Sequence, residues 1–231
     1  MRAQLSDDVA LKRSQAQDVA AKLKKRLGKS IQGLKLVEVG CAAGALLVGL
    51  ADAGFDVRGV EVDQVNGQVA LQRMGTGKVH IGSLETAAFA DESFDVVFSD
   101  QVIEHVADTR PFVNECFRIL KPGGLMWVGT PNFGGLSARL LKHRWKECVP
   151  TEHIRMFTPE SMRYYLMGGG FSRVEVWTHG LSLVRRVGHA ESEYRQNLLP
   201  LRREGLARRT LSKLASLASM GDGLSAFALR S

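Results

Sequence analysis

The chain contains little cysteine, with only Cys41, Cys116 and Cys148 among its 231 residues. These three residues are widely separated and form no Cys-x-x-Cys pair, which argues against a disulfide framework and against a cysteine-based zinc site. We therefore expect three reduced thiols, mostly buried in the core.

Long apolar runs are also missing. No uncharged apolar stretch approaches the roughly 20 residues that span a bilayer. The first residues are polar, with Asp7 and Asp8 where a secretory signal would be apolar. We expect a soluble, cytoplasmic protein. Its 231 residues, 45% of them hydrophobic, suit one globular domain with modest extensions.

Aromatic residues make up 7% of the chain and do not alternate with basic residues, so the sequence does not favour nucleic-acid binding. The net charge is nevertheless +7. Such basic runs usually form solvated helix faces, and an acidic partner or an anionic membrane surface is the alternative interpretation. The basic residues concerned lie near the two ends and are Lys22, Lys24, Lys25, Arg26, Lys29, Arg185, Arg186, Arg195, Arg202, Arg203, Arg208, Arg209 and Lys213.

The most informative segment is Leu-Val-Glu-Val-Gly-Cys-Ala-Ala-Gly at 36–44. A short β-forming run enters a turn of small residues there, and Gly-Val-Glu-Val-Asp at 59–63 follows about 20 residues after Gly40. A glycine turn after one strand and an acidic residue at the end of the next are typical of the nucleoside site in a doubly wound α/β sheet. The glycines let the backbone approach a ligand closely.

Nicotinamide and flavin dehydrogenases begin in a similar way, so the spacing alone does not choose the cofactor. A pyrophosphate-binding turn prefers Gly-x-Gly-x-x-Gly, with amides aimed at phosphate, whereas Ala42 stands at the second glycine here. Glu38, just before the turn, suits an ammonium or a sulfonium better than a phosphate. Ala42 narrows the turn slightly without forbidding it, because an alanine costs little if its φ is negative.

Strand and helix patterns alternate along the chain, which predicts an α/β fold with a parallel sheet and crossover helices. Residues 1–33 form an N-terminal helical extension, with an amphipathic helix over about 6–27, and residues 34–231 form a single domain. The expected strands are 36–39, 56–60, 79–81, 94–98, 125–129, 173–178 and 224–229, and the expected helices are 42–53, 65–74, 109–120 and one that begins at 158. Residues 132–157 are expected to be irregular, and a basic insertion at about 185–220 is expected to be helical from about 191.

Several downstream segments extend the pattern: Ser-Phe-Asp-Val-Val at 93–97, Val-Ile-Glu-His-Val at 102–106, Arg-Ile-Leu-Lys-Pro-Gly-Gly at 118–124, Thr-Pro-Asn at 130–132, Glu-His-Ile at 152–154, Phe-Thr at 157–158 and Gly-Phe at 170–171. With the turn, they resemble the class I S-adenosylmethionine-dependent methyltransferases. The similar branch includes ubiquinone-biosynthesis O-methyltransferases and related bacterial small-molecule methyltransferases. The resemblance covers about 36–178.

The resemblance implies a Rossmann-like, doubly wound seven-stranded sheet of order 3-2-1-4-5-7-6, with the last strand antiparallel. It also implies S-adenosylmethionine as cofactor, bound over the carboxyl ends of the strands. The positions that match the cofactor site are Glu38, Gly40, Cys41, Ala42 and Gly44 at the methionine portion, Glu61 at the ribose with Val62 next to it in sequence, Ser83 and Leu84 at the adenine, and Asp100 and Gln101 at the sulfonium end.

Methyl transfer requires mainly that donor and acceptor be oriented and that water be excluded. A hydroxyl acceptor also benefits from a base, and His105 or His153 could serve because histidine titrates near neutral pH. An interpretation in which each histidine only hydrogen-bonds its own loop stays open. Trp145 and His153 lie where this family places part of its acceptor pocket, and we expect them to contact the acceptor or a lid over it.

Two departures from the family pattern matter. Relatives that make ubiquinone carry a second glutamate three residues before the Glu-His pair, an acidic set that resembles a metal site, and Gln101 takes that position here. We therefore predict no metal. Ser83 stands where an aspartate often binds the adenine amino group, which predicts weaker adenine binding.

The resemblance thus predicts an enzyme that methylates a small-molecule acceptor, with O-methylation of a quinone precursor, a sugar-linked intermediate or another secondary metabolite favoured. One alternative is an inactive S-adenosylmethionine-binding protein that acts through its basic ends. A nicotinamide-dependent oxidoreductase is disfavoured by Ala42 and by the Pro-Gly-Gly and Thr-Pro-Asn segments. The basic insertion could form a lid, a homodimer contact or a surface for an anionic membrane.

Overall fold

The computed structural model describes residues 2–187, 194–197 and 206–231, and the side chains of residues 11–184 and 209–231. The chain divides into two compact units, which are described separately. The first comprises Met1–Ser99, Asn114–Trp127 and Leu229–Ser231, and the second comprises Asp100–Val113 and Val128–Ala228.

The first unit alternates strands and helices as the sequence predicts. Its elements are α1 (Arg2–Leu27), β1 (Lys35–Val39), α2 (Ala45–Asp52), β2 (Asp56–Glu61), α3 (Gln64–Met74), β3 (Val79–Ile81), the 3-10 helix η1 (Glu85–Ala87) and β4 (Phe94–Asp100). Strand β1 pairs in parallel with β2 on one side and with β4 on the other. Because all residues of β1 and β4 except Lys35 and Asp100 are buried, these two strands form the centre of this unit.

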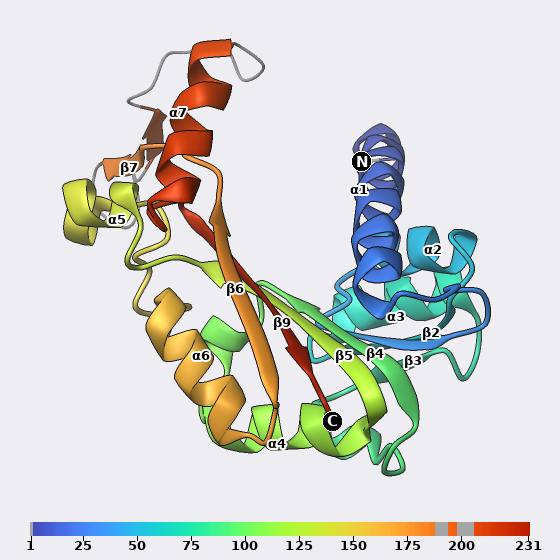
Figure 1. Cartoon of the computed structure of the whole chain (residues 1–231). Helices are drawn as coiled ribbons and strands as arrows, with labels where there is room; N and C mark the ends of the chain where they lie inside the picture. The colour runs from blue at the N-terminus through green and yellow to red at the C-terminus, as the bar shows by residue number, and fades with distance from the viewer. Residues whose placement is uncertain (1, 188–193, 198–205) are drawn as a thin grey trace. The chain divides into compact units, whose positions relative to one another are not determined.

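Helix α1 packs on α2 (Figure 1). Its buried side chains recur at helical spacing and are Ala16, Val19, Ala20 and Leu23. The close approach depends on Gly49 of α2, since a Cβ at that position would lie 2.5 Å from the Cβ of Ala16. The amphipathic pattern expected for the N-terminal extension therefore serves to bury one face of α1.

The second unit contains the end of β5 (Leu120–Pro131) and the following segments. These are η2 (Ile103–His105), the first residues of α4 (Thr109–Ile119), α5 (Leu136–Leu141), η3 (Lys142–Arg144), α6 (Pro159–Gly168), β6 (Arg173–His179), β7 (Val184–Val187), β8 (Tyr194–Asn197), α7 (Leu206–Leu217) and β9 (Gly223–Leu229). Helices α6 and α7 both pack on β6 (Figure 1). Helix α6 begins at a capping box between Thr158 and Ser161, with Pro159 in its first turn.

The seven-stranded sheet has the order β3-β2-β1-β4-β5-β9-β6. Strand β9 is antiparallel to β5: at one end the Gly123 amide donates to the Arg230 carbonyl and the Arg230 amide donates to the Gly124 carbonyl, and at the other end the Asn132 amide donates to the Asp222 carbonyl. With β9 counted as the seventh strand, this is the order 3-2-1-4-5-7-6 that the sequence predicts. The Rossmann-like α/β fold is confirmed.

Four element predictions are wrong in detail. Helix α2 begins at Ala45 rather than Ala42, and β5 begins at Leu120, so the Lys-Pro-Gly-Gly segment at 121–124 lies inside the strand. The insertion contains the antiparallel pair β7–β8, in which Val184 faces Asn197, so its backbone pairs between strands where a helix was expected. Part of that predicted helix, 191–193 and 198–205, lies outside the described residues. Residues 132–157 contain α5 and η3 rather than only irregular backbone.

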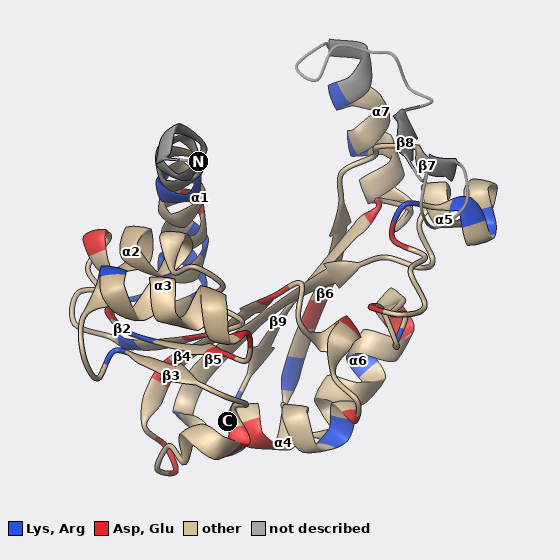
Figure 2. Cartoon of the chain, turned by 180° about the vertical axis from the view of Figure 1, so that it is seen from behind, with Lys and Arg blue, Asp and Glu red and all other residues tan. Residues whose placement is uncertain are grey.

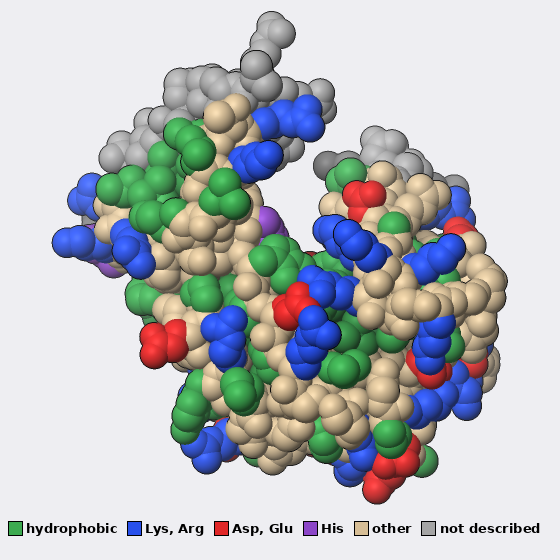
Figure 3. All heavy atoms as spheres, in the orientation of Figure 1, with side chains coloured by type: hydrophobic (Ala, Val, Ile, Leu, Met, Phe, Trp, Pro, Cys, Tyr) green, Lys and Arg blue, Asp and Glu red, His purple; other side chains and the backbone are tan. Residues whose placement is uncertain are grey.

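Basic residues flank α5 and lie on α7 (Figure 2). On α7, Leu211, Leu214 and Leu217 are 40%, 58% and 74% exposed, and Figure 3 shows hydrophobic side chains at the surface in the region of this helix. Within the described residues, none of the helices combines the length and apolar character that a membrane span needs.

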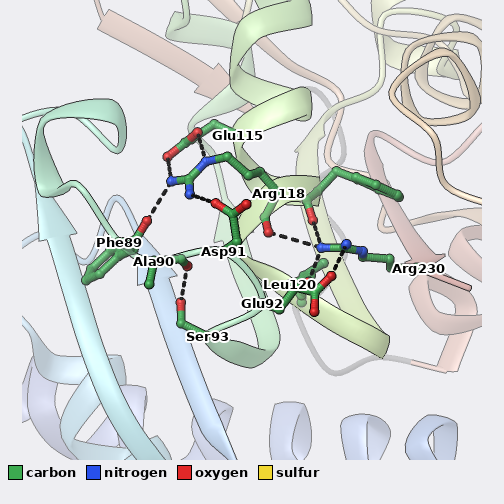
Figure 4. A network of polar contacts seen from close by, with 10 residues as sticks. Phe89, Ala90, Asp91, Glu92, Ser93, Glu115, Arg118, Leu120 and Arg230 are labelled. Carbon is green, nitrogen blue, oxygen red and sulfur yellow. Dashed lines mark hydrogen bonds and ion pairs between the residues drawn. The ribbon is translucent and has the colours of Figure 1, made fainter.

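Within the first unit, Arg118 connects the end of α4 to the loop before β4 (Figure 4). Its guanidinium makes a bidentate pair with Glu115 at 2.6 and 2.8 Å, and it also binds Asp91 and the carbonyl of Phe89. The planar five-donor guanidinium can serve all three partners at once, which a lysine could not.

Arg230, directly after β9, closes the end of α4 (Figure 4). Its guanidinium donates to the backbone carbonyls of Phe117, Arg118 and Leu120, and it pairs with Glu92 at 2.6 Å. These carbonyls lie where the helix ladder ends, so Arg230 supplies the donors that the helix itself lacks there.

Asp222 connects three segments of the second unit. Its carboxylate accepts hydrogen bonds from the hydroxyl of Ser137 at 2.7 Å and from the amide and hydroxyl of Ser182 at 2.7 and 3.0 Å. The Ser137 hydroxyl in turn accepts from the Leu183 amide. The start of α5 and the chain after β6 are thereby fixed to the start of β9.

Asp95 connects three segments of the first unit. It accepts hydrogen bonds from the Lys35 amide at 3.0 Å and the Lys121 ammonium at 2.8 Å, and Lys29 lies 3.9 Å away. Burial alone would raise the pKa of Asp95, but the contacts with Lys121 and the Lys35 amide outweigh it and lower that pKa below its ordinary value.

We predict that Asp95→Asn lowers the free energy of unfolding at pH 7 by about 1–3 kcal/mol, because charge-assisted hydrogen bonds are lost. A lowered pKa in the folded state stabilises above the unfolded pKa of about 4, and that stabilisation disappears as the pH falls through the folded value. Urea unfolding at pH 7 and pH 3 should therefore show a large difference from wild type at the first pH and a small one at the second.

The control is Asp52→Asn, because Asp52 is 58% exposed and forms only a surface pair with Arg13. It should change stability by less than about 1 kcal/mol. If the difference in the free energy of unfolding between Asp95→Asn and wild type does not vary with pH, the stabilisation does not come from the ionised Asp95 carboxylate.

Candidate active site

The turn between β1 and α2, residues 40–44, is called the glycine turn below. Gly40, Ala42 and Gly44 all have positive φ, at 77°, 46° and 76°. The condition under which an alanine costs little, a negative φ, is therefore not met at Ala42, and the left-handed conformation costs an alanine about 1 kcal/mol. The space at Gly44 is also limited, since a Cβ there would lie 3.1 Å from Ala70.

Glu61, at the end of β2, holds the glycine turn in this conformation. Its Oε2 accepts a hydrogen bond from the Ala42 amide at 2.7 Å, and its Oε1 accepts one from the Asp63 amide at 2.9 Å. Glu61 is only 8% exposed, so these bonds are largely shielded from water. Each carboxylate oxygen keeps a second lone pair that can accept from a ligand hydroxyl.

Cys41 and Glu38 are buried beside Glu61 in the first unit. Burial, followed by the charges of Glu38 and Glu61, raises the pKa of the Cys41 thiol to about 12. Cys41 therefore stays protonated and is not a nucleophile. The turn is lined by carboxylates and a neutral thiol, which suits a cationic ligand better than a phosphate.

The predicted adenine side lies next to Glu61. The Gly82 amide donates to the Glu61 carbonyl at 2.8 Å, which brings Ser83 to the end of β2. Leu84 is buried, whereas Val62 is 72% exposed and offers an apolar surface beside the acidic strand end. The Ser83 hydroxyl accepts from the Thr86 amide at 3.3 Å and can still donate.

Asp100 and Gln101 belong to the second unit. Gln101 has a positive φ of 59°, and its backbone N–H donates to the Gly129 carbonyl at 2.9 Å. Gly129 leaves room for Asp100, since a Cβ at Gly129 would lie 1.9 Å from Asp100 Oδ1. The chain thus turns sharply just after β4.

Glu104, His105 and His153, called the Glu-His-His cluster below, come together in the second unit. One ligand atom from each lies within 4.8 Å of the others, and the two imidazole rings meet edge to face with centroids 4.9 Å apart. His105 Nδ1 binds the Glu152 carbonyl at 2.8 Å, and His153 Nδ1 binds the Glu147 carbonyl at 2.6 Å.

The carbonyl partners determine the tautomer of both histidines. A carbonyl only accepts, so each Nδ1 carries a proton, and in the neutral ring Nε2 then presents a lone pair. Glu104 is 2% exposed, and its Oε2 accepts from the Thr130 hydroxyl at 2.9 Å. Its Oε1 is buried and has no hydrogen-bond partner among the described residues. Burial raises the pKa of Glu104, and Thr130 and the two histidines oppose that rise.

The cluster borders a small cavity in the second unit. The cavity measures about 10 Å³, which is room for a single water-sized occupant, and Glu104, Trp145, His153 and Arg155 contribute to its wall. Trp145 is only 1% exposed, and its Nε1 has no hydrogen-bond partner among the described residues. Trp145 and His153 thus share the wall of this cavity, and Trp145 lies inside the unit rather than on its surface.

The prediction of no metal depended on Gln101, and sequence reasoning did not connect His153 with Glu104. The available signal was the repeated Glu-His pair at 104–105 and 152–153. Folding brings the second histidine to the first pair, so one carboxylate and two imidazoles face one another. Chemically, this set can accept a proton or hold a cation.

Residues 37–128 match a protein family described as "Methyltransferase domain". The chain is 35% identical over 144 residues to the ubiquinone biosynthesis O-methyltransferase of Chelativorans sp., covering 61% of this chain and 54% of that protein. It is 37% identical over 107 residues to a probable S-adenosylmethionine-dependent methyltransferase of Mycolicibacterium smegmatis, covering 46% and 42%. The chain spans about half the length of these curated relatives.

Solved structures share the fold at low identity. A possible histamine N-methyltransferase from Thermotoga maritima superposes with a TM-score of 0.60 at 21% identity, covering 86% of this chain and 83% of that one. The phosphoethanolamine N-methyltransferase 2 of Haemonchus contortus, solved with S-adenosyl-L-methionine, gives a TM-score of 0.60 at 20% identity, covering 92% and 52%.

The matched segment contains the glycine turn, Glu61 and the start of the Glu-His-His cluster. This part of the chain is thus similar to methyltransferase domains, and the chain shares its fold with solved S-adenosylmethionine-dependent methyltransferases.

Proposed function

We propose that the protein transfers the methyl group of S-adenosylmethionine to a hydroxyl of a small-molecule acceptor. The observation that carries this proposal is the glycine turn, whose left-handed Ala42 is held by Glu61 while Glu38 lies buried beside it. A turn that presents carboxylates instead of bare amides suits a sulfonium nucleoside and not a dinucleotide pyrophosphate.

In this proposal the cofactor lies across the ends of β1 and β2. Glu61 accepts both ribose hydroxyls with its remaining lone pairs, and Val62 and Leu84 pack against the adenine. Ser83 offers only a hydroxyl to the adenine. The backbone of Gly40, Cys41, Ala42 and Gly44 borders the methionine portion, and Glu38 attracts its ammonium group.

The chain that follows β4 supplies the acceptor side. Strands β1 and β4 are parallel neighbours, with Val39 opposite Ser99, so the glycine turn and the segment after β4 leave from the same edge of the sheet. Ligands of open α/β sheets bind at that edge. We assign Asp100 and Gln101 to the sulfonium end, and His105 and His153 to the acceptor.

The proposed reaction is an in-line displacement at the methyl carbon. The acceptor oxygen forms a bond to that carbon as the bond from carbon to sulfur breaks, and the sulfonium becomes a neutral thioether. The acceptor hydroxyl loses its proton, which the Nε2 of His105 or His153 accepts. Positioning and water exclusion supply most of the remaining acceleration.

Relatives named ubiquinone biosynthesis O-methyltransferase support a quinone precursor as acceptor, with a sugar-linked intermediate or another secondary metabolite as the other acceptor classes. The exposed leucines of α7, with the basic Arg209 and Lys213 on the same helix, support contact with an anionic membrane surface or with a second copy of the chain.

Calorimetry with S-adenosylhomocysteine should show binding at one site per chain, and NAD should not bind. Glu61→Gln should weaken S-adenosylhomocysteine at least about tenfold, because one charge-assisted acceptor is lost. Asp52→Asn, on the exposed end of α2, should bind as wild type does. Binding of NAD without binding of S-adenosylhomocysteine would exclude the methyltransferase interpretation.

Transfer of labelled methyl from S-adenosylmethionine to catechol, a phenolic probe, should fall about 100-fold in His105→Asn and in His153→Asn. Asparagine can still donate to the backbone carbonyl that Nδ1 now binds, so the loop stays anchored while the Nε2 group is lost. His143→Asn, on the exposed η3, is the control. Unchanged turnover in both variants, with unchanged S-adenosylhomocysteine binding, would assign these histidines to structure alone.

No turnover by wild type on phenolic, sugar or amine probes would favour an inactive cofactor-binding protein.

Sedimentation with vesicles should separate the roles of α7. We expect binding to phosphatidylserine-containing vesicles at low salt, with loss at high salt and in the double variant Leu214→Ser and Leu217→Ser. If none of the protein sediments with these vesicles at low salt, the membrane role is excluded, and a monomer in analytical ultracentrifugation would also exclude the second copy.

A further inference from the structure

We propose that the base end of the nucleoside site does not select adenine, and that the protein binds S-adenosyl and S-inosyl nucleosides with similar affinity because Ser83 reads the base. A hydroxyl group both donates and accepts, so it can bind the amino group of adenine or the carbonyl group of hypoxanthine. This inference rests on the proposed function, in which the ribose lies on Glu61 and Ser83 faces the exocyclic group of the base.

Hydrogen bonds between β2 and β3 place Ser83 next to Glu61. Glu61 lies opposite Ile81 in this parallel pair, and the Gly82 amide donates to the Glu61 carbonyl at 2.8 Å. Ser83 is the next residue. The loop 82–86 therefore leaves the sheet at the same edge as the carboxylate assigned to the ribose, so a base attached to that ribose meets the first side chains of this loop.

The hydrogen bonds of the loop determine how the Thr86 hydroxyl is used. This hydroxyl lies 2.9 Å from the Ser83 carbonyl, and a carbonyl only accepts, so the hydroxyl proton of Thr86 is donated there. The Thr86 oxygen therefore accepts from His80 Nε2, which is 2.9 Å away. Gly82 makes room for this contact, since a Cβ at Gly82 would lie 2.6 Å from Thr86 Oγ1 and 2.7 Å from His80 Nε2. The side chain of Thr86 is thus engaged as donor and as acceptor.

The Ser83 hydroxyl is in a different state. Its oxygen accepts from the backbone N–H of Thr86 at 3.3 Å, which holds the side chain to the loop and uses one lone pair. Among the described residues, no acceptor takes the Ser83 hydroxyl proton. The proton and the second lone pair are therefore available to a ligand. A rotation about the C–O bond exchanges the two, so the hydroxyl can donate or accept without a movement of the backbone.

The side chains around Ser83 do not distinguish an amino group from a carbonyl. Val62 is 72% exposed and Leu84 is buried, and both are apolar. Apolar contacts recognise the shape of a ring but discriminate weakly between groups of similar size at its edge. One oxygen of Asp63 is used to cap α3, where it accepts from the Asn66 amide at 2.7 Å. Among these side chains, the choice between the two bases falls to Ser83.

A carboxylate in place of Ser83 would behave differently. An ionised carboxylate only accepts, so it binds the amino group of adenine and repels the carbonyl oxygen of hypoxanthine. A site built in this way rejects the wrong analogue strongly, because a polar group is then left without its partner. Ser83 creates no such repulsion, and its bond to adenine is neutral rather than charge-assisted.

Calorimetry on the full chain tests the proposal with S-adenosylhomocysteine and with S-inosylhomocysteine, in which hypoxanthine replaces adenine. Wild type should bind the two with dissociation constants within about tenfold of each other, since either base forms one neutral hydrogen bond. Ser83→Asp should separate them by at least about 100-fold in favour of S-adenosylhomocysteine. Ser83→Ala should weaken both by a similar factor of about 2 to 10, because each complex loses one hydrogen bond.

Ser30→Asp is the matched control. Ser30 is exposed and also accepts from a backbone N–H, that of Gln32 at 3.3 Å, but it precedes β1 and so lies away from the carboxyl ends of the strands. This variant should bind the two probes in the same ratio as wild type.

A third probe isolates the exocyclic group. The methoxypurine analogue of S-adenosylhomocysteine carries an acceptor oxygen in place of the amino group and keeps the neighbouring ring nitrogen as it is in adenine. Wild type should bind it about as well as S-inosylhomocysteine, and Ser83→Asp should reject it. Retention of this analogue by Ser83→Asp would overturn the assignment of Ser83 to the exocyclic group.

Two further results would overturn the proposal while leaving the proposed function intact. One is wild type that binds S-adenosylhomocysteine but binds S-inosylhomocysteine more than about tenfold more weakly. The other is a ratio that Ser83→Asp leaves unchanged, since another group would then read the base. If wild type does not bind S-adenosylhomocysteine at all, the proposed function fails and this inference fails with it.

Discussion

The hydrogen bond between the Glu61 carboxylate and the Ala42 amide is the contact on which the cofactor side depends. An alanine with positive φ has no intrinsic reason to stay there, and the bond at 2.7 Å supplies one. The same carboxylate binds the Asp63 amide at the start of α3. One side chain therefore sets the glycine turn, the end of β2 and the entry to the next helix. Strain at Ala42 and anchoring by Glu61 form a single local unit, which is the usual way in which a functional turn retains an unfavourable backbone angle.

In the second unit, a few hydrogen bonds likewise fix the backbone around the Glu-His-His cluster. The loops that carry His105 and His153 are joined by the bond from His105 Nδ1 to the Glu152 carbonyl, and the Arg155 amide binds the Glu104 carbonyl. The loop before α6 is thus held to the segment after β4 by contacts from both sides. This arrangement orders the ring nitrogens before any ligand arrives, and preorganised donors of this kind reduce the cost of binding or catalysis.

The sequence predicts most of the fold because the residues that become buried recur with the period of the helix or strand that carries them. Strand β3 has the bounds that the sequence predicts, Val79–Ile81, and α6 begins at the Thr-Pro-Glu signal. The errors occur where a long-range contact decides the local structure. An alanine side chain does not reveal that residue 42 has a positive φ, because Glu61 imposes it from 19 positions away. The β7–β8 pair likewise overrides the helical pattern of the insertion. The cofactor positions follow from the turn and the acidic strand end, whereas the meeting of His153 with Glu104 depends on tertiary structure and is visible in sequence only as a repeated Glu-His pair.

The place of β9 has a consequence for the order of assembly. It is the last strand in the chain, yet it lies between β5 and β6. During synthesis, β6 emerges before the strand that will separate it from β5. Until β9 arrives, the hydrogen-bonding edge of β5 is exposed, and pairing with the wrong strand is a hazard at such an edge. Arg230, directly after β9, binds three carbonyls around the end of α4. These contacts therefore fix the register of β9 at the end of the strand that completes the sheet.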